Sequence, residues 1–192
     1  MLRETGLTQP PSPFLKKLSS SIVEAVPGLI LDVPSGRGRN ALLLRKFGRK
    51  VVCVDNAPHV LQNIVQIESF VQRSDNQLPT SRKPVKRGKL FPLSLDLRRK
   101  QWPFLPNVFA VIVNVHFVCA WLFNHFLVSL KPGGYLLCET FGGQGMNYID
   151  LPEKGAWKEL LQDRMEFEYY KEHSVGPPGG KAVTVKFLGR KR

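Results

Sequence analysis

Cysteine is scarce in this chain of 192 residues. There are three, Cys53, Cys119 and Cys138, and no two of them form a CxxC pair. An odd number of isolated cysteines in apolar runs excludes a disulfide framework or a zinc site of common spacing, and indicates reduced thiols in a core. The first twenty residues also lack an apolar stretch followed by a small-residue cleavage site, so no secretory signal is expected. These absences predict a cytoplasmic protein.

Acidic residues are also few, 15 against 28 Lys and Arg, which gives a formal net charge of +13. Much of the excess lies in three segments, 81–89 (SRKPVKRGK), 98–100 (RRK) and 190–192 (RKR). Such segments are either solvated surface or a contact for an anionic partner such as RNA or an acidic substrate. Both readings stay open, although no aromatic run typical of an RNA-recognition strand accompanies the charge.

Residues 108–130 contain no Asp, Glu, Lys or Arg, a length that would suit a membrane span. Four polar side chains, those of Asn114, His116, Asn124 and His125, argue against that reading. The first half is rich in β-branched residues and the second half is not. We therefore predict a buried strand followed by a buried helix, and no membrane association.

The remaining pattern alternates between strands and helices. Ser12 and Pro13 mark the cap and first residue of a helix whose apolar face would contain Phe14, Leu18, Ile22 and Val26. Further strands are expected at 29–33, 50–55, 89–96, 108–115 and 135–141, with helices at 39–48, 58–72 and 119–130 and a turn at 131–134.

The last fifty residues break this alternation. A Gly-rich loop at 142–152 and a short helix at 153–162 precede two strands, 165–173 and 182–189, with no helix between them. Because a parallel pair needs a long crossover, these two strands must be antiparallel. The sequence therefore predicts one α/β domain over 1–192, with a Rossmann-like, mostly parallel seven-stranded sheet and a C-terminal antiparallel pair.

A glycine motif lies between the strand at 29–33 and the helix that follows it. Residues 36–41 (GRGRNA) match GxGxxG/A, and Asp55 follows Gly36 by nineteen residues, at the end of the next strand. Glycines let the backbone approach a ligand, the helix offers free N–H groups, and an acid at this distance accepts ribose hydroxyls. An adenosine-type ligand is indicated.

The residues before the glycines narrow the choice of adenosine-type ligand. Asp32 ends the strand and Pro34-Ser35 intervene, whereas a nicotinamide dinucleotide motif would set its first Gly directly after the strand. "DVPSGRG" (Asp32 to Gly38) resembles the first motif of class I S-adenosylmethionine-dependent methyltransferases, except that Pro34 occupies the first Gly position and fixes φ near −65° there. "GRGRN" is similar to the run in small tellurite-resistance type methyltransferases.

This resemblance implies three segments: an N-terminal helical part (1–28), a cofactor-binding core (29–141) and a substrate-side part (142–192). Asp55 would bind the ribose of S-adenosylmethionine, and Asp96 would lie by the adenine amine with Leu97 behind the ring. The implied cofactor-binding residues are Asp32, Ser35, Gly36, Arg37, Gly38, Asp55, Asn56, Asp96, Leu97 and Asn114, and the implied substrate-side residues are Arg39, Phe117, Asn147 and Tyr148.

The activity expected from the resemblance is methyl transfer to a small molecule or ion, such as an oxyanion or a thiol, without a metal. His116 is the candidate general base, needed only when the acceptor arrives protonated. Three alternatives stay open: an RNA-modifying or RNA-binding protein, a non-catalytic protein with a methyltransferase-like fold, and a nicotinamide oxidoreductase. The sequence leaves the acceptor and the oligomeric state undetermined.

Overall fold

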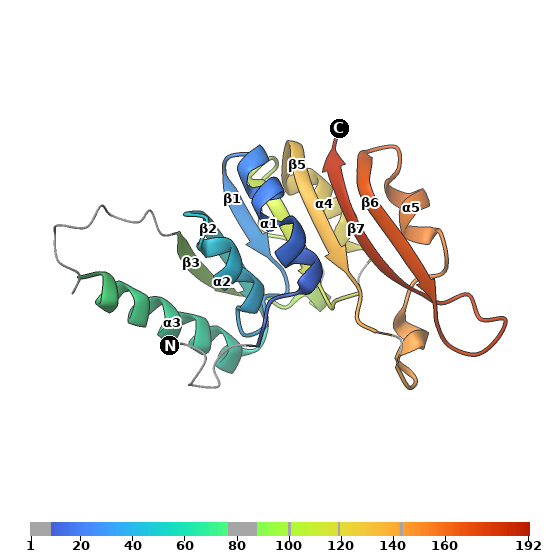
Figure 1. The fold of residues 1–192 in the computed structure, drawn as a ribbon, viewed down its shortest axis with the longest axis horizontal. Coiled ribbons are helices and arrows are strands. Elements are labelled where there is room, and N and C mark those ends of the chain that lie inside the picture. The colour runs from blue at the N-terminus through green and yellow to red at the C-terminus, as the bar shows by residue number, and fades with distance from the viewer. Residues whose placement is uncertain (1–8, 77–87, 100, 119, 143) are drawn as a thin grey trace. The chain divides into compact units, whose positions relative to one another are not determined.

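The computed structural model describes residues 9–76, 88–99, 101–118, 120–142 and 144–192 (Figure 1). Most of the basic segment at 81–89, and Lys100, lie outside these residues. The chain forms two compact units, Met1–Trp102 and Pro103–Arg192. The expectation of a single domain stays a prediction.

The first unit alternates helices and parallel strands. Its strands run in the order β3-β2-β1, so both crossovers carry a helix between parallel neighbours. The carboxyl ends of β1 and β2, at Asp32 and Asp55, therefore lie at the same edge of the sheet. The elements are α1 (Pro13–Ala25), β1 (Leu29–Asp32), α2 (Arg39–Arg45), β2 (Lys50–Asp55), α3 (Pro58–Asn76), β3 (Lys89–Ser94) and the 3₁₀ turn η2 (Leu97–Arg99).

Helix α1 begins as the sequence predicts, and its buried face is rotated slightly from the predicted one. The Ser12 hydroxyl accepts the N–H of Leu15 at 3.2 Å, and Pro13 is the first helical residue. Of the predicted apolar face, Ile22 is fully buried, while Phe14, Leu18 and Val26 are half-buried at its edge. Helix α1 lies beside α2 (Figure 1). The buried residues of α1 are Leu15, Ser19, Ile22 and Val23.

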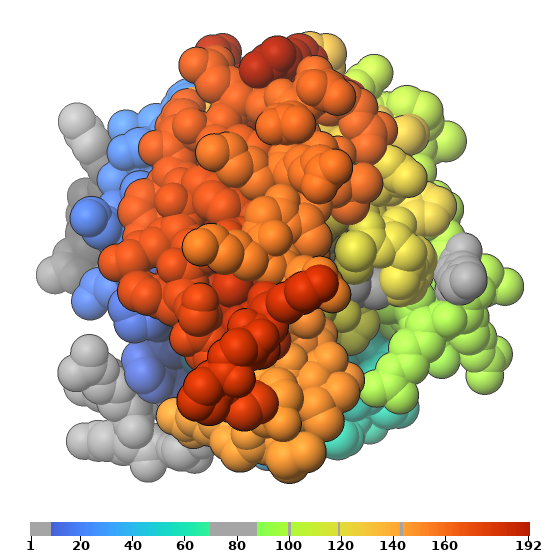
Figure 2. All heavy atoms as spheres, turned by 90° about the vertical axis from the view of Figure 1, so that its right-hand side faces the viewer, coloured from blue at the N-terminus to red at the C-terminus, as the bar shows by residue number. Residues whose placement is uncertain are grey.

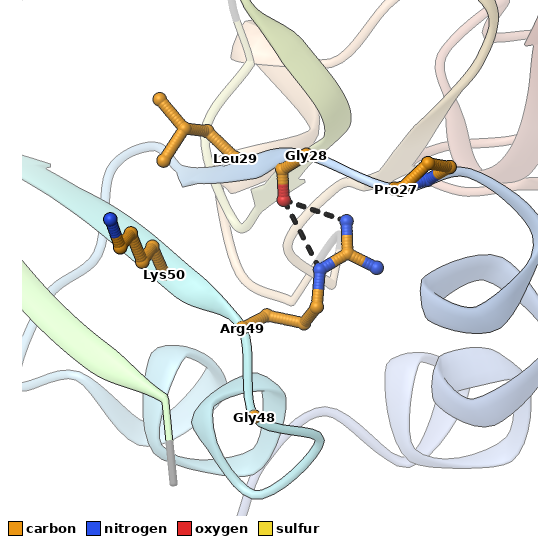
Figure 3. A pocket seen from close by; sticks show the side chains of 6 residues that line it. All are labelled: Pro27, Gly28, Leu29, Gly48, Arg49 and Lys50. Carbon is orange, nitrogen blue, oxygen red and sulfur yellow. Dashed lines mark hydrogen bonds between the residues drawn. The ribbon is translucent and has the colours of Figure 1, made fainter. Parts of the chain in front are cut away.

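Arg49 closes the C-terminal end of α1. Its guanidinium donates to the carbonyls of Val23, Val26 and Gly28, with distances of 2.8 Å to Val26 and 2.7 Å to Gly28 from the same nitrogen. Figure 3 shows the contact of Arg49 with the Gly28 carbonyl. The carbonyls of Val23 and Val26 belong to the end of α1, where a helix leaves them without an intrahelical partner, and that of Gly28 directly precedes β1. A shallow depression of about 410 Å³ lies here, at the amino ends of β1 and β2, and is lined by Pro27, Gly28, Leu29, Gly48, Arg49 and Lys50.

The second unit joins one parallel and two antiparallel pairings. β4 and β5 are parallel, and β7 lies antiparallel between β5 and β6. The described residues thus form seven strands, mostly parallel and closed by an antiparallel pair, and the predicted α/β fold class is confirmed. The elements are β4 (Phe109–Val115), α4 (Leu122–Ser129), β5 (Leu130–Glu139), the 3₁₀ turn η3 (Asn147–Asp150), α5 (Ala156–Leu161), β6 (Met165–Ser174) and β7 (Val183–Lys191).

Strand β5 starts earlier than predicted. Residues 131–134 were expected to form a turn, yet they belong to β5, which pairs Leu130 with Phe109 and shifts register before Tyr135. Gly133 has φ 71°, so the turn chemistry of Lys-Pro-Gly-Gly is present as an irregularity inside the strand. The uncharged segment 108–130 forms β4 and α4, and no described helix is long and apolar enough to cross a membrane.

Aromatic rings fill the core of the second unit on one side of β7. Phe187 lies 5.5 Å from Phe167 and packs against Trp157, whose ring centroid lies 4.9 Å from that of Phe123. All of these rings except that of Phe167 are fully buried or nearly so. The hairpin β6–β7 and helices α4 and α5 are therefore held together by edge-to-face contacts.

Candidate functional site

The Gly-rich turn after β1 is bonded to the end of β2. The N–H of Ser35 donates to the carbonyl of Val54 at 2.7 Å, and the N–H of Gly36 donates to Oδ2 of Asp55 at 3.0 Å. Oδ1 of Asp55 accepts the N–H of Ala57, also at 3.0 Å. The structure thus brings together the turn and the acid that sequence spacing paired, and each carboxylate oxygen keeps a second lone pair for another donor.

Gly38 is needed at the start of α2 for two reasons. Its φ is 81°, a left-handed conformation that L side chains rarely adopt. A Cβ at this position would also lie 3.0 Å from Cγ1 of Ile64 on α3. Gly36 has φ 51° but open space around it. The second glycine of the motif therefore serves helix packing, and the first serves the turn itself. The peptide bond between Val33 and Pro34 is cis.

Asp32 and Ser35 carry buried polar atoms without a hydrogen-bond partner among the described residues. Asp32 is fully buried, and its Oδ2 accepts the N–H of Ala41 at 3.0 Å while Oδ1 has no partner. The hydroxyl of Ser35 is also buried and has no partner among the described residues. Burial raises the pKa of Asp32 from 3.8 to about 7; the Ala41 N–H and the charge of Arg39 oppose this rise, and Asp55 adds to it. Unsatisfied buried groups beside a Gly-rich turn fit a polar ligand.

Asp96 follows β3 and caps η2. Its Oδ1 accepts the N–H of Arg98 at 3.0 Å, and its Oδ2 lies 3.4 Å from Nε of Arg99. About a third of the Asp96 side chain remains exposed, while Leu97 is buried. Two other predicted cofactor residues lie close to the turn in sequence and are exposed, Arg37 and Asn56. Their roles stay predictions.

Arg39 and Asn40 hold the chain segment that precedes α1. Nη1 of Arg39 donates to the carbonyl of Pro10 at 3.5 Å, and Oδ1 of Asn40 accepts the N–H of Ser12 at 3.0 Å. Asn40 is buried, and sequence reasoning gave it no role. The "RN" of the GxGRN run therefore has a structural use in this chain, and the substrate-side role of Arg39 stays a prediction.

In the second unit, three predicted residues lie at the end of β4. Asn114 is buried and pairs in register with Cys138, and Phe117 is half-buried. His116 is exposed, has φ 62°, and donates its backbone N–H to the carbonyl of Glu139 at 2.7 Å. A left-handed conformation at a residue with a Cβ costs energy and is enriched at functional positions.

Glu139 was missed by sequence reasoning. It ends β5, is buried, and lies 2.6 Å from Nζ of Lys186 on β7. The next residue, Thr140, exchanges hydrogen bonds with the backbone of Val185. An acid at a strand end was a visible signal, but its partner lies 47 positions further on and follows only from the β5–β7 register.

The loop after β5 packs on the β6–β7 connection. A Cβ at Gly176 would lie 3.0 Å from Cγ and Cδ2 of Tyr148, so the ring of Tyr148 rests directly on this glycine. In Figure 2 the red β6–β7 connection forms a ridge beside the amber residues of this loop. Asn147 is exposed on the same turn. The described residues contain no cluster of three or more His, Cys, Asp or Glu side chains that would hold a metal ion.

Comparison with known proteins identifies the fold. No protein-family model and no curated protein sequence matches the chain. Solved structures of S-adenosylmethionine-dependent methyltransferases do match it with probability 1.00, so the chain has the fold of class I methyltransferases.

Three structures illustrate the likeness. PH0226 from Pyrococcus horikoshii has a TM-score of 0.63 at 14% identity, over 93% of this chain and 88% of that one. Geranyl diphosphate methyltransferase in complex with S-adenosylmethionine has 0.63 at 12%, over 92% and 85%. TehB from Haemophilus influenzae has 0.63 at 17%, over 92% and 62%. At these identities the likeness establishes the fold alone.

Proposed function

We propose that this protein binds S-adenosylmethionine and transfers a methyl group to a small molecule. The observation that carries the proposal is the turn after β1. Its backbone is bonded to Asp55, and Oδ1 of Asp32 and Oγ of Ser35 are buried beside it with no hydrogen-bond partner in the described part of the chain. Ligands of open α/β sheets bind at the carboxyl ends of the strands. Structural neighbours that bind S-adenosylmethionine support the same ligand.

The residues of the first unit fit this cofactor by their chemistry. The free lone pairs of Asp55 accept two ribose hydroxyls, and the Asp32 carboxyl group accepts from an ammonium group, which would return its pKa toward the ordinary value. Asp96 accepts from the adenine amine beside the apolar side chain of Leu97. When bound, the cofactor supplies a methyl group on a sulfonium. The glycines let the backbone approach it closely.

In the second unit, we propose His116 as the general base. His116, held at the end of β4 by the Glu139 carbonyl, takes the proton of an acceptor that arrives protonated, such as a thiol. An acceptor that arrives as an oxyanion needs no base. In either case the second-unit residues contribute mainly by orienting the acceptor. A nucleophile held in line at about 3 Å from the methyl carbon already obtains much of the rate enhancement.

Calorimetric titration with S-adenosylmethionine and S-adenosylhomocysteine tests the cofactor. We expect one-to-one saturable binding by the wild type and at least tenfold weaker binding by Asp55→Ala, a loss of about 1.4 kcal/mol. Asp163→Ala removes an exposed acid elsewhere in the chain and should bind as the wild type does. Circular dichroism of both variants separates lost affinity from lost structure.

Two results would contradict the proposal. Absence of binding to both ligands by the folded wild type would favour a non-catalytic protein with this fold. Binding of NADH with no binding of S-adenosylmethionine would favour an oxidoreductase. If the cofactor binds and no acceptor of any class yields S-adenosylhomocysteine, the catalytic part of the proposal fails while the binding part stands.

A further inference from the structure

The depression at the amino ends of β1 and β2 lies at the opposite edge of the first unit from the candidate cofactor site. Its volume of about 410 Å³ is that of a pocket for a small organic molecule. Leu29 gives it an apolar wall and Lys50 an ammonium group, and Figure 3 shows both side chains directed away from Arg49. Asp32 and Asp55 end the same two strands at the other edge. The methyl transfer proposed above therefore makes no use of this depression.

Strand register places residues of β3 beside the depression. Lys50 pairs in register with Lys89, and Val52 pairs with Phe91. Because side chains alternate along a strand, Lys50, Lys89 and Phe91 all lie on one face of the sheet. Leu90 has the opposite orientation and is buried where α3 packs on β3. The lysines and Phe91 are thus on the face opposite α3, and Phe91 is 36% exposed there.

Two positive charges lie side by side on this face. Like charges directly opposite one another on neighbouring strands destabilise a sheet. Lys50 and Lys89 are both exposed, and no ion pair among the described residues includes either of them. Nζ of Lys89 lies 5.3 Å from the centroid of the Phe91 ring, so its stem runs along the strand over an apolar surface. An anion bound to both ammonium groups would remove their repulsion.

The spacing of the strands sets the size of the ligand. Leu29 on β1 and Phe91 on β3 are two strand spacings apart, about 10 Å, and Phe91 lies about 7 Å beyond Lys89 along β3. A bicyclic aromatic body covers such an area, and one acidic group on it reaches both lysines. The net charge of +13 favours the arrival of anions. It also opposes the docking of a second copy of the chain on this face, because the lysines of the two copies would repel.

We propose that Leu29, Lys50, Lys89 and Phe91 form an amino-edge site that binds a small organic anion with an aromatic body, such as an aryl carboxylate or sulfonate. The anionic group lies between the two ammonium groups, and the aromatic body contacts Leu29 and Phe91. The site is separated from Asp55 by the length of β2, about 17 Å. It therefore binds its ligand whether or not S-adenosylmethionine is bound.

The test titrates the full chain with two fluorescent probes that share one aromatic skeleton. 8-Anilino-1-naphthalenesulfonate carries a negative charge, and N-phenyl-1-naphthylamine carries none. We expect the wild type to bind the sulfonate saturably at one site, about tenfold or more tightly than the amine. Lys50→Gln/Lys89→Gln should weaken sulfonate binding about tenfold or more, whereas Lys50→Arg/Lys89→Arg keeps both charges and should stay within about threefold of the wild type. Phe91→Ser should weaken sulfonate binding about threefold or more, because the aromatic contact is lost.

Three controls place the effect at this site. Lys16→Gln/Lys17→Gln removes the same two charges from exposed positions in the first half of α1 and should bind the sulfonate as the wild type does. Saturating S-adenosylhomocysteine should leave sulfonate binding unchanged. Circular dichroism and urea unfolding of each variant separate lost affinity from lost structure.

Four results would overturn the inference: no saturable sulfonate binding, equal affinity for the two probes, equal losses in the two glutamine double variants, or displacement of the sulfonate by S-adenosylhomocysteine. Sedimentation with phosphatidylglycerol vesicles distinguishes a free organic anion from a lipid headgroup. We expect the protein to stay in the supernatant; pelleting that Lys50→Gln/Lys89→Gln abolishes would overturn the inference in favour of a membrane surface. Methyl transfer enters none of these measurements, so this inference and the proposed function fail separately.

Discussion

The ionisation of Asp32 is coupled to folding. This carboxyl group is fully buried, and burial raises its pKa from 3.8 to about 7. Between these two values the folded state binds more protons than the unfolded state, so stability falls as pH rises through this window and levels off above about pH 7. The contribution is the reverse of the usual one for a salt-bridged acid.

Replacing Asp32 with Asn should remove this pH dependence. Asn keeps an acceptor for the Ala41 N–H and has no charge to bury. Urea unfolding from pH 5 to pH 8 should show the wild type losing about 1 kcal/mol per pH unit relative to Asp32→Asn up to pH 7, and little beyond. A constant difference between the two proteins across this range would show that Asp32 keeps an ordinary pKa. Saturating S-adenosylmethionine should flatten the wild-type curve.

At the scale of elements, Arg49 couples helix α1 to the start of β2. One guanidinium satisfies two carbonyls at the end of the helix and a third, that of Gly28, in the connection to β1. Without the guanidinium, these carbonyls can bond only to water. A hydrogen bond to a charged donor contributes about 1.5–3 kcal/mol to the free energy of unfolding.

We expect Arg49→Met to lower the free energy of unfolding by about 2–3 kcal/mol in denaturant titration. Lys50→Met removes a neighbouring exposed charge and should change it by less than about 0.5 kcal/mol. Equal effects of the two substitutions would mean that the helix end does not depend on Arg49. Neither substitution should alter affinity for S-adenosylmethionine, because both lie at the amino ends of the strands.

The elements show which parts of the structure local patterns determine. β2 runs over the predicted residues 50–55, since a short apolar run with an acid at its end fits only a buried parallel strand here. The predicted start of β5 was wrong. The glycines at 133 and 134 indicate a turn, but the pairing of Leu130 with Phe109 extends the strand through them. Sequence spacing cannot weigh such a pairing against a local turn preference.

In the candidate site, too, contacts set by local spacing could be predicted and contacts set by long-range packing could not. Asp55 and Gly36 were paired by a known spacing within one βαβ unit, and the structure bonds them directly. The contact of Asn40 with Ser12, by contrast, joins segments whose proximity depends on how α1 packs against α2. Sequence analysis also missed η3, a 3₁₀ turn at Asn147–Asp150 inside a segment expected to be an irregular loop.

At the scale of the whole molecule, the net charge of +13 bears on the RNA alternative. Phosphate contacts release counterions, so their affinity falls steeply with salt. Fluorescence anisotropy with a single-stranded RNA should show only weak binding at 50 mM salt that is lost by 200 mM, the behaviour of a basic surface without a specific RNA site. Submicromolar binding that persists at 200 mM salt would instead make RNA the leading candidate for the acceptor.

The residue next to Arg49 offers a position at which a label can be attached. Lys50 begins β2 and Asp55 ends it, so the two positions are about 17 Å apart along one strand. The buried thiols of Cys53 and Cys138 have a raised pKa and resist alkylation. A Lys50→Cys variant in which Cys119 is replaced by serine would therefore accept a single dye or surface tether at the amino edge, which allows ligand arrival at the carboxyl edge to be followed one molecule at a time.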